Sequence, residues 1–179
     1  MIRADKITKI TVSLFILAFP FMVNGQELSP GDSAIVKEIK AKTSQIYENS
    51  VKPNFYLTNQ KLQSDKNFGL SLVAFKINDA VSRVISSCFT KQGQLSTEYF
   101  FDDGKVIFIY QTFEYFDKYS AKGTWKNFKG LTGWECRFYY LDDKLVHYEQ
   151  NGLDASQVVV KAKQNKSGAH NILNYLAKK

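Results

Sequence analysis

The two cysteines are the most reactive side chains that the sequence offers. Cys88 and Cys136 are the only cysteines of the 179-residue chain, and both fall in stretches with the alternating pattern of β-strands. In an oxidising compartment they could form a disulfide that joins the predicted strands of residues 81–89 and 134–141. Two buried free thiols are the alternative. A catalytic cysteine is not indicated, because no histidine or asparagine is arranged to activate one.

Acid–base chemistry would have to come from one histidine and a few glutamates. His147 lies two residues before Glu149, so both side chains would share one face of a strand, and such a pair could act as a base with its orienting partner. Glu98, Glu114 and Glu135 are carboxylates in an aromatic setting, where burial can raise the pKa. No spacing singles out two of them as a glycosidase-like pair. We predict no catalytic residue, and a hydrolase with a sheet-lined carboxylate and histidine pocket stays as an alternative.

Two acidic pairs raise the question of a metal site. Asp102 and Asp103, and likewise Asp142 and Asp143, are adjacent, but the oxygen-rich spacing of a calcium-binding loop is missing. Aspartates in such positions are typical of tight turns. The chain also has no glycine-rich nucleotide-binding loop and no zinc-protease motif. The sequence therefore predicts neither a bound metal nor a cofactor.

Aromatic residues offer binding chemistry rather than catalysis. They make up 15% of the chain, and 16 of the 26 lie between Tyr99 and Tyr148. The predicted strand of residues 106–116 is apolar on both faces at its start, so its second face should also be covered, by residues 117–133, by a partner or by a ligand. Aromatic side chains suit cores and binding surfaces alike. The candidate ligand-binding residues are Phe108, Tyr110, Trp134, Phe138 and Tyr140.

Two helices flank the region that carries these side chains. Ser29-Pro30-Gly31-Asp32 has the pattern of a capped helix start, and the apolar spacing that follows predicts a helix over residues 30–49. A second helix is predicted after Asn151-Gly152, with Asp154 as its cap and an end near Ala177.

Between the helices, residues 54–149 alternate with the period of β-strands and are interrupted by turn signals. This order predicts an α+β fold: an N-terminal helix, an antiparallel β-meander of five to six strands, and a C-terminal helix packed on the sheet. We expect both helices to cover one face of the sheet, which would leave the other face for binding.

Two predicted hairpins share a motif. Tyr99-Phe100-Phe101-Asp102-Asp103-Gly104-Lys105-Val106-Ile107 parallels Phe138-Tyr139-Tyr140-Leu141-Asp142-Asp143-Lys144-Leu145-Val146, although the second turn lacks a glycine after Asp143. The motif resembles small exported bacterial domains of unknown function, which carry an N-terminal helix, a meander with aromatic-Asp/Asn-Gly-Lys turns and a C-terminal helix. The resemblance covers roughly residues 30–178. It implies this fold and an envelope or secreted location, and it transfers no catalytic residue.

The first 25 residues predict export. Three basic residues among the first nine precede an apolar stretch over residues 10–23, and Val23-Asn24-Gly25 suits a cleavage site, so residues 1–25 are interpreted as a signal peptide. The apolar stretch falls short of the roughly 20 residues that span a bilayer, and no cysteine near the cut supports lipid attachment. The sequence therefore predicts one mature domain over residues 26–179, periplasmic or secreted, not a lipoprotein and without a stable membrane span.

Charge narrows the partner classes. Removal of residues 1–25 takes away three basic residues and one acidic residue, which lowers the formal net charge from +7 to +5. The remaining lysines are scattered, so no nucleic-acid partner is predicted. We expect a non-enzymatic binding domain whose aromatic-rich sheet face takes an apolar small molecule. A protein-partner interaction or inhibitor module is the first alternative, ahead of the hydrolase.

Overall fold

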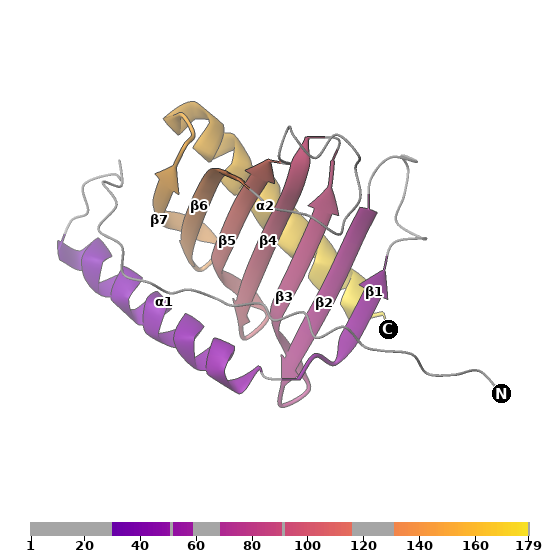
Figure 1. Ribbon diagram of the computed structural model, residues 1–179. Helices are drawn as coiled ribbons and strands as arrows, with labels where there is room; N and C mark the ends of the chain where they lie inside the picture. Colours follow the sequence, from indigo (N-terminus) through magenta and orange to yellow (C-terminus); the bar gives the residue numbers. More distant parts are fainter. Residues whose placement is uncertain (1–29, 51, 59–68, 91, 116–130, 179) are drawn as a thin grey trace.

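The computed structural model describes residues 30–50, 52–58, 69–90, 92–115 and 131–178 (Figure 1). The predicted signal peptide, the apolar stretch within it and most of the connection 117–133 lie outside the described residues. The elements, in chain order, are α1 (Pro30–Asn49), β1 (Phe55–Thr58), β2 (Gly69–Ile77), β3 (Ala80–Phe89), β4 (Gly93–Asp102), β5 (Lys105–Tyr115), β6 (Leu131–Leu141), β7 (Lys144–Asn151) and α2 (Ala155–Leu176).

The sheet is a meander in which the strand order is the chain order. Its seven strands run β1-β2-β3-β4-β5-β6-β7, and every neighbouring pair is antiparallel. The α+β prediction of an N-terminal helix, an antiparallel meander and a C-terminal helix is confirmed. Six strands are eight or more residues long, and the seventh is the four-residue edge strand β1. Among the described residues, no helix is long and apolar enough to cross a membrane.

The three hairpins β2–β3, β4–β5 and β6–β7 are built alike. Both central residues of each turn have a positive φ: Asn78 and Asp79, Asp103 and Gly104, and Asp142 and Asp143. This is the backbone that a two-residue type I′ turn requires, and Asp and Asn tolerate it better than most residues. In each hairpin the register also shifts just before the turn. The β2–β3 hairpin thus has the same turn geometry as the β4–β5 and β6–β7 hairpins, whose shared motif is visible in the sequence.

The helices cover opposite faces of the sheet, so the expectation that they share one face is wrong (Figure 1). The start of β5 explains the difference. Val106 and Ile109 belong to the core under α2, whereas Ile107 and Phe108 pack in the cluster under α1. The two-sided apolarity of this strand therefore reflects two helices, with one on each face.

Helix α2 seals the larger core. Val158, Ala162 and Ala169 pack on the sheet with Phe138 and other apolar side chains of β2 to β6. At the start of α2, the Asp154 N–H donates to Gln157 Oε1 at 3.2 Å, as in a capping box. The run of three valines at residues 158–160, a pattern also typical of strands, is helical.

Helix α1 covers a smaller part of the opposite face. Val36 and Ile39 are buried against Tyr139, and Phe108 and Val146 pack beside them. The helix lies near the strand ends that form the hairpin turns (Figure 1); at one of these turns, Lys42 Nζ pairs with Asp102 Oδ2 of β4 at 2.7 Å. The residues farther along the strands on this face form the site described next.

Candidate functional site

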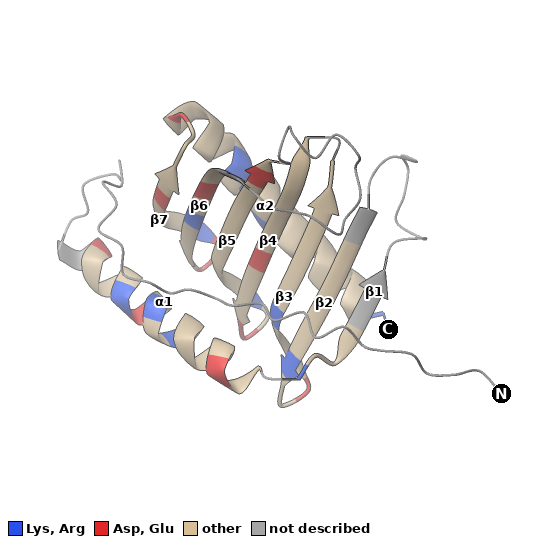
Figure 2. Ribbon diagram, in the orientation of Figure 1, with Lys and Arg blue, Asp and Glu red and all other residues tan. Residues whose placement is uncertain are grey.

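Two neighbouring cross-strand rows on the α1 side of the sheet consist almost entirely of polar residues. We call them the polar rows and define them by their residues on β4, β5, β6 and β7. The first row is Glu98, Tyr110, Arg137 and Glu149, and the second is Ser96, Thr112, Glu135 and Asn151. Apart from Arg83 on β3 and the residues near the hairpin turns, the charged residues of the sheet lie on β4 to β7 (Figure 2). The first row borders the apolar cluster under α1, which includes Tyr139 and Phe108.

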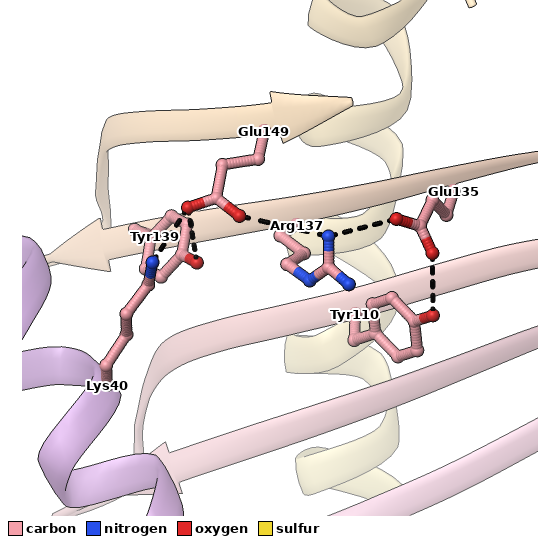
Figure 3. Close-up of polar contacts among 6 residues, drawn as sticks. All are labelled: Lys40, Tyr110, Glu135, Arg137, Tyr139 and Glu149. Atoms are coloured by element: carbon pink, nitrogen blue, oxygen red, sulfur yellow. Dashed lines mark hydrogen bonds and ion pairs between the residues drawn. The ribbon is translucent and has the colours of Figure 1, made fainter. Parts of the chain in front are cut away.

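Glu149 links the polar rows to α1 (Figure 3). Lys40 Nζ donates to Glu149 Oε1 at 2.9 Å, and the Tyr139 hydroxyl donates to the same oxygen at 3.1 Å. Burial alone would raise the pKa of Glu149, but these hydrogen bonds and the charge of Lys40 outweigh it and hold that pKa below its usual value. Glu149 is therefore ionised at neutral pH.

Arg137 stands between two carboxylates (Figure 3). Its Nη1 donates to Glu135 Oε1 at 3.0 Å and lies 3.8 Å from Glu149 Oε2. The guanidinium carbon lies 5.1 Å from the centroid of the Tyr110 ring, and the Tyr110 hydroxyl donates to Glu135 Oε2 at 3.0 Å. Burial, reinforced by the charge of Glu135, raises the pKa of Tyr110 to about 12. The phenol therefore stays protonated, which makes it a fixed hydrogen-bond donor at neutral pH.

A buried ion pair closes the first row at β4. Arg83 Nε donates to Glu98 Oε1, and both residues are buried. The Arg83 guanidinium lies over the rings of Tyr47 and Phe75, at 4.4 and 4.9 Å from their centroids. Burial raises the pKa of Glu98, and the charge of Arg83 opposes that rise. The pair fixes the end of α1 to β3 and β4.

Among the described residues, no hydrogen bond joins the residues considered for acid–base chemistry. His147 is 6% exposed, and its Nδ1 has no hydrogen-bond partner among the residues that the structure describes. Its ring lies 5.5 Å from that of Tyr139, and burial lowers its pKa. Glu98 and Glu135 lie on β4 and β6, with β5 between them. A dyad of His147 and Glu149 is not formed through the buried nitrogen.

The five candidate aromatic residues do not share a face, which corrects that part of the expected binding surface. Phe138 and Tyr140 are 0% and 2% exposed in the core under α2, and Trp134 packs against that core. Phe108 lies in the cluster under α1, and Tyr110 belongs to the polar rows. The reason is the strand register.

That register pairs Phe108 with Tyr139 of β6 rather than with Phe138. Because side chains alternate along a strand, Phe138 therefore points to the opposite side of the sheet. Trp134 shares that side, where the ammonium of Lys161 lies 4.0 Å from the centroid of its ring.

Cys88 and Cys136 are free thiols. They lie on β3 and β6, with β4 and β5 between them. Three strand spacings amount to about 14 Å, whereas disulfide-bonded Cα atoms lie within about 7 Å of one another. The disulfide alternative is therefore wrong for one chain in this fold. Burial raises the pKa of the Cys136 thiol to about 11, so it is neither ionised nor nucleophilic at neutral pH.

Reasoning from the sequence did not identify the two cations at the centre of the site, Lys40 and Arg137. Arg137 could have been identified, because Glu135, Arg137 and Tyr139 alternate and must share one face of a strand. No sequence pattern indicates Lys40, since its contact with β7 depends on where α1 packs on the sheet.

Among the described residues, no group of three or more His, Cys, Asp or Glu side chains is placed to hold a metal ion. Comparisons of the chain with models of protein families, with curated proteins and with solved structures find no match.

Proposed function

We propose that the chain is an exported, non-enzymatic binding domain that holds a small molecule on the polar rows. The observation that carries the proposal is the chain of contacts from Lys40 through Glu149, Arg137 and Glu135 to Tyr110. These side chains are held in place by one another and by Lys40 of α1, yet Arg137 keeps 34% of its side chain exposed. Preorganised and partly exposed polar groups lower the cost of binding a ligand.

The polar character of these rows favours a polar ligand over the apolar one expected from the aromatic content. Of the five candidate aromatic residues, only Phe108 and Tyr110 lie on the α1 side. An apolar molecule placed here would bury the carboxylates and the guanidinium without replacing their contacts with water, which is costly.

A fragment screen by two-dimensional NMR tests the binding function. The mature chain, residues 26–179, would be labelled with ¹⁵N and titrated with a library of small polar and apolar fragments. We expect polar fragments to shift the amide signals of Thr112, Arg137 and Glu149 and to leave those of Val158 and Ala162 in place. Shifts confined to α2, or no shifts at all, would reject the proposal. Arg137→Ala should abolish the shifts, whereas Lys105→Ala, at an exposed turn, should not.

Export is the second part of the proposal and rests on the sequence of residues 1–25. Expression of the full chain in a bacterial host, followed by mass analysis of the periplasmic fraction, tests it. The expected product begins at Gln26. A product that keeps Met1 in the cytoplasmic fraction would contradict the proposal.

A protein-partner module remains the second candidate function because of the β6–β7 hairpin. Leu141 and Leu145 are 46% and 37% exposed at this hairpin, and β7 is an edge strand of the sheet. Edge strands with exposed apolar residues can pair with another chain. Replacement of both leucines by lysine should leave fragment binding on the polar rows unchanged, whereas it would abolish a partner contact at the edge.

A further inference from the structure

The charges of the polar rows cancel within the site. Lys40 and Arg137 pair with Glu149 and Glu135, and the buried Arg83 pairs with Glu98. Three cations therefore face three carboxylates at contact distance. A charged group of a ligand would have to displace one of these partners and leave it partly buried without a counter-charge, which costs several kcal/mol in proteins. The site consequently favours a ligand without net charge.

The residues of the polar rows can still donate hydrogen bonds to a ligand and accept hydrogen bonds from it. Of the five N–H groups of the Arg137 guanidinium, only those on Nη1 have a partner among the described residues. Thr112 and Ser96 add half-buried hydroxyl groups in the neighbouring row, and each hydroxyl can donate and accept. Carboxylate oxygens of Glu135 and Glu149 have further lone pairs for a donor. The surface is thus complementary to a molecule with several groups that both donate and accept.

The dimensions of the polar rows point to a ligand larger than a single small group. They extend over β4 to β7, and three strand spacings correspond to about 14 Å. A row of donors and acceptors of this length matches a chain of hydroxyl groups on successive rings. An aromatic residue in the row, Tyr110, is held by the guanidinium stacked on it and contributes its edge and hydroxyl.

We propose that the ligand of the polar rows is a neutral saccharide, an inference that rests on the binding function proposed above. Sugar hydroxyl groups accept from the N–H groups of Arg137 that have no partner among the described residues, and they donate to Glu135 and Glu149. They exchange hydrogen bonds with the hydroxyls of Ser96 and Thr112. No ion pair of the site has to be broken, because the ligand brings no charge.

A glycan array tests the saccharide class. The fluorescently labelled mature chain, residues 26–179, would be applied to an array that displays neutral glycans beside sialylated and sulfated ones. We expect binding to a set of neutral glycans that the acidic groups do not improve. Loss of hydrogen bonds to a charged group should weaken this binding about ten- to a hundredfold in Arg137→Ala. Arg137→Lys should also bind weakly, because an ammonium lacks the planar fork of the guanidinium.

Two further variants separate loss of contact from loss of fold. Thr112→Val keeps the shape of the side chain and removes only its hydroxyl, so it should weaken glycan binding while the melting temperature stays close to that of the wild type. Lys105→Ala removes one positive charge at an exposed turn outside the rows and should bind like the wild type.

The outcomes distinguish the two proposals. Binding to acidic glycans alone would overturn the charge argument. No glycan binding, combined with fragments that shift the signals of Thr112 and Arg137, would overturn the saccharide class and leave the binding function in place. If neither glycans nor fragments bind, both proposals fail.

Discussion

The two faces of the sheet are held by helices in different ways. Under α2, side chains from five strands form one apolar core, and the polar groups inside it are paired. Gln111 and Asn165 exchange hydrogen bonds of 2.9 and 3.0 Å, and the Tyr140 hydroxyl donates to the Ala162 carbonyl at 2.9 Å. Under α1, a small apolar cluster borders ion pairs and a polar surface.

Three buried side-chain atoms have no hydrogen-bond partner among the described residues. Thr43 Oγ1 lies on α1 and His147 Nδ1 under it, whereas Asp143 Oδ1 lies at the β6–β7 turn, 3.4 Å from His170 Nε2 of α2. Each such atom costs stability. The large apolar core under α2 and the mixed apolar and polar surface under α1 indicate that one face mainly maintains the fold, while the other is available for the proposed binding. The following predictions test this division.

Loss of a large core side chain should affect the α2 side most. Phe138→Ala removes a fully buried ring and should lower the free energy of unfolding by about 3–5 kcal/mol. Phe108→Ala is the matched change at a partly buried ring that packs against the cluster under α1, and we expect a clearly smaller loss. Urea denaturation of both variants provides the measurement. Equal losses would mean that the two faces contribute alike.

The buried ion pair should be the most sensitive polar contact on the α1 side. Arg83→Met leaves the Glu98 carboxylate buried without its partner and should cost about 3–5 kcal/mol at neutral pH. Burial already raises the pKa of Glu98, and loss of Arg83 raises it further, so the carboxyl becomes neutral in the folded state as the pH falls. The deficit relative to the wild type should therefore shrink on acidification. Added Glu98→Gln should remove this pH dependence.

The amide pair on the α2 side should show a smaller loss. Asn165→Ala leaves the buried Gln111 amide with only its bond to Thr97, and we expect a loss of about 1–3 kcal/mol. Replacement of both residues by leucine should recover most of the stability, since neither amide is then left unpaired. A double variant that is less stable than Asn165→Ala would show that the pair is required for packing.

The smallest effect should be a loss of local stability at α1 that appears only when the pH is lowered. His147 is neutral in the fold because burial lowers its pKa, and Lys40 acts in the same direction while Glu149 and Asp32 oppose it. The stability that depends on this neutral form is present above the unfolded pKa of about 6.5 and is lost as the pH falls toward the lowered one. The protection factors of residues 36–47, which correct for the slower intrinsic exchange at lower pH, should fall as the pH drops below about 6.5. His147→Leu should flatten the response, and an unchanged response would contradict it.

Local patterns in the sequence predicted the elements well. The helix over residues 30–49 and the start of α2 after Asp154 follow from cap and periodicity signals, and the hairpins follow from turn residues. The side of the sheet that each helix takes did not follow. Both faces of β5 are apolar at its start, so the sequence allows either arrangement.

The candidate site was predicted less well, because the sequence does not show which residues of neighbouring elements share a face. Tyr110 was identified, but Phe138 and Tyr140 were placed with it although they point to the opposite face. Strand pairing determines which alternate residues become neighbours, and the register shift between Tyr139 and Tyr140 is not visible in a composition pattern. Contacts between distant elements, such as Lys40 with Glu149, depend on docking and lay beyond sequence reasoning.

The sequential strand order has a consequence for how the chain folds. Each strand pairs with the one that precedes it, so the sheet can grow hairpin by hairpin through contacts that are close in the chain, which favours rapid folding. Both helices depend on contacts that are distant in the chain, and for α1 these include Lys40 with Glu149, which lies 109 residues away. Helix α1 therefore cannot complete its contacts with the sheet until β7 has been added.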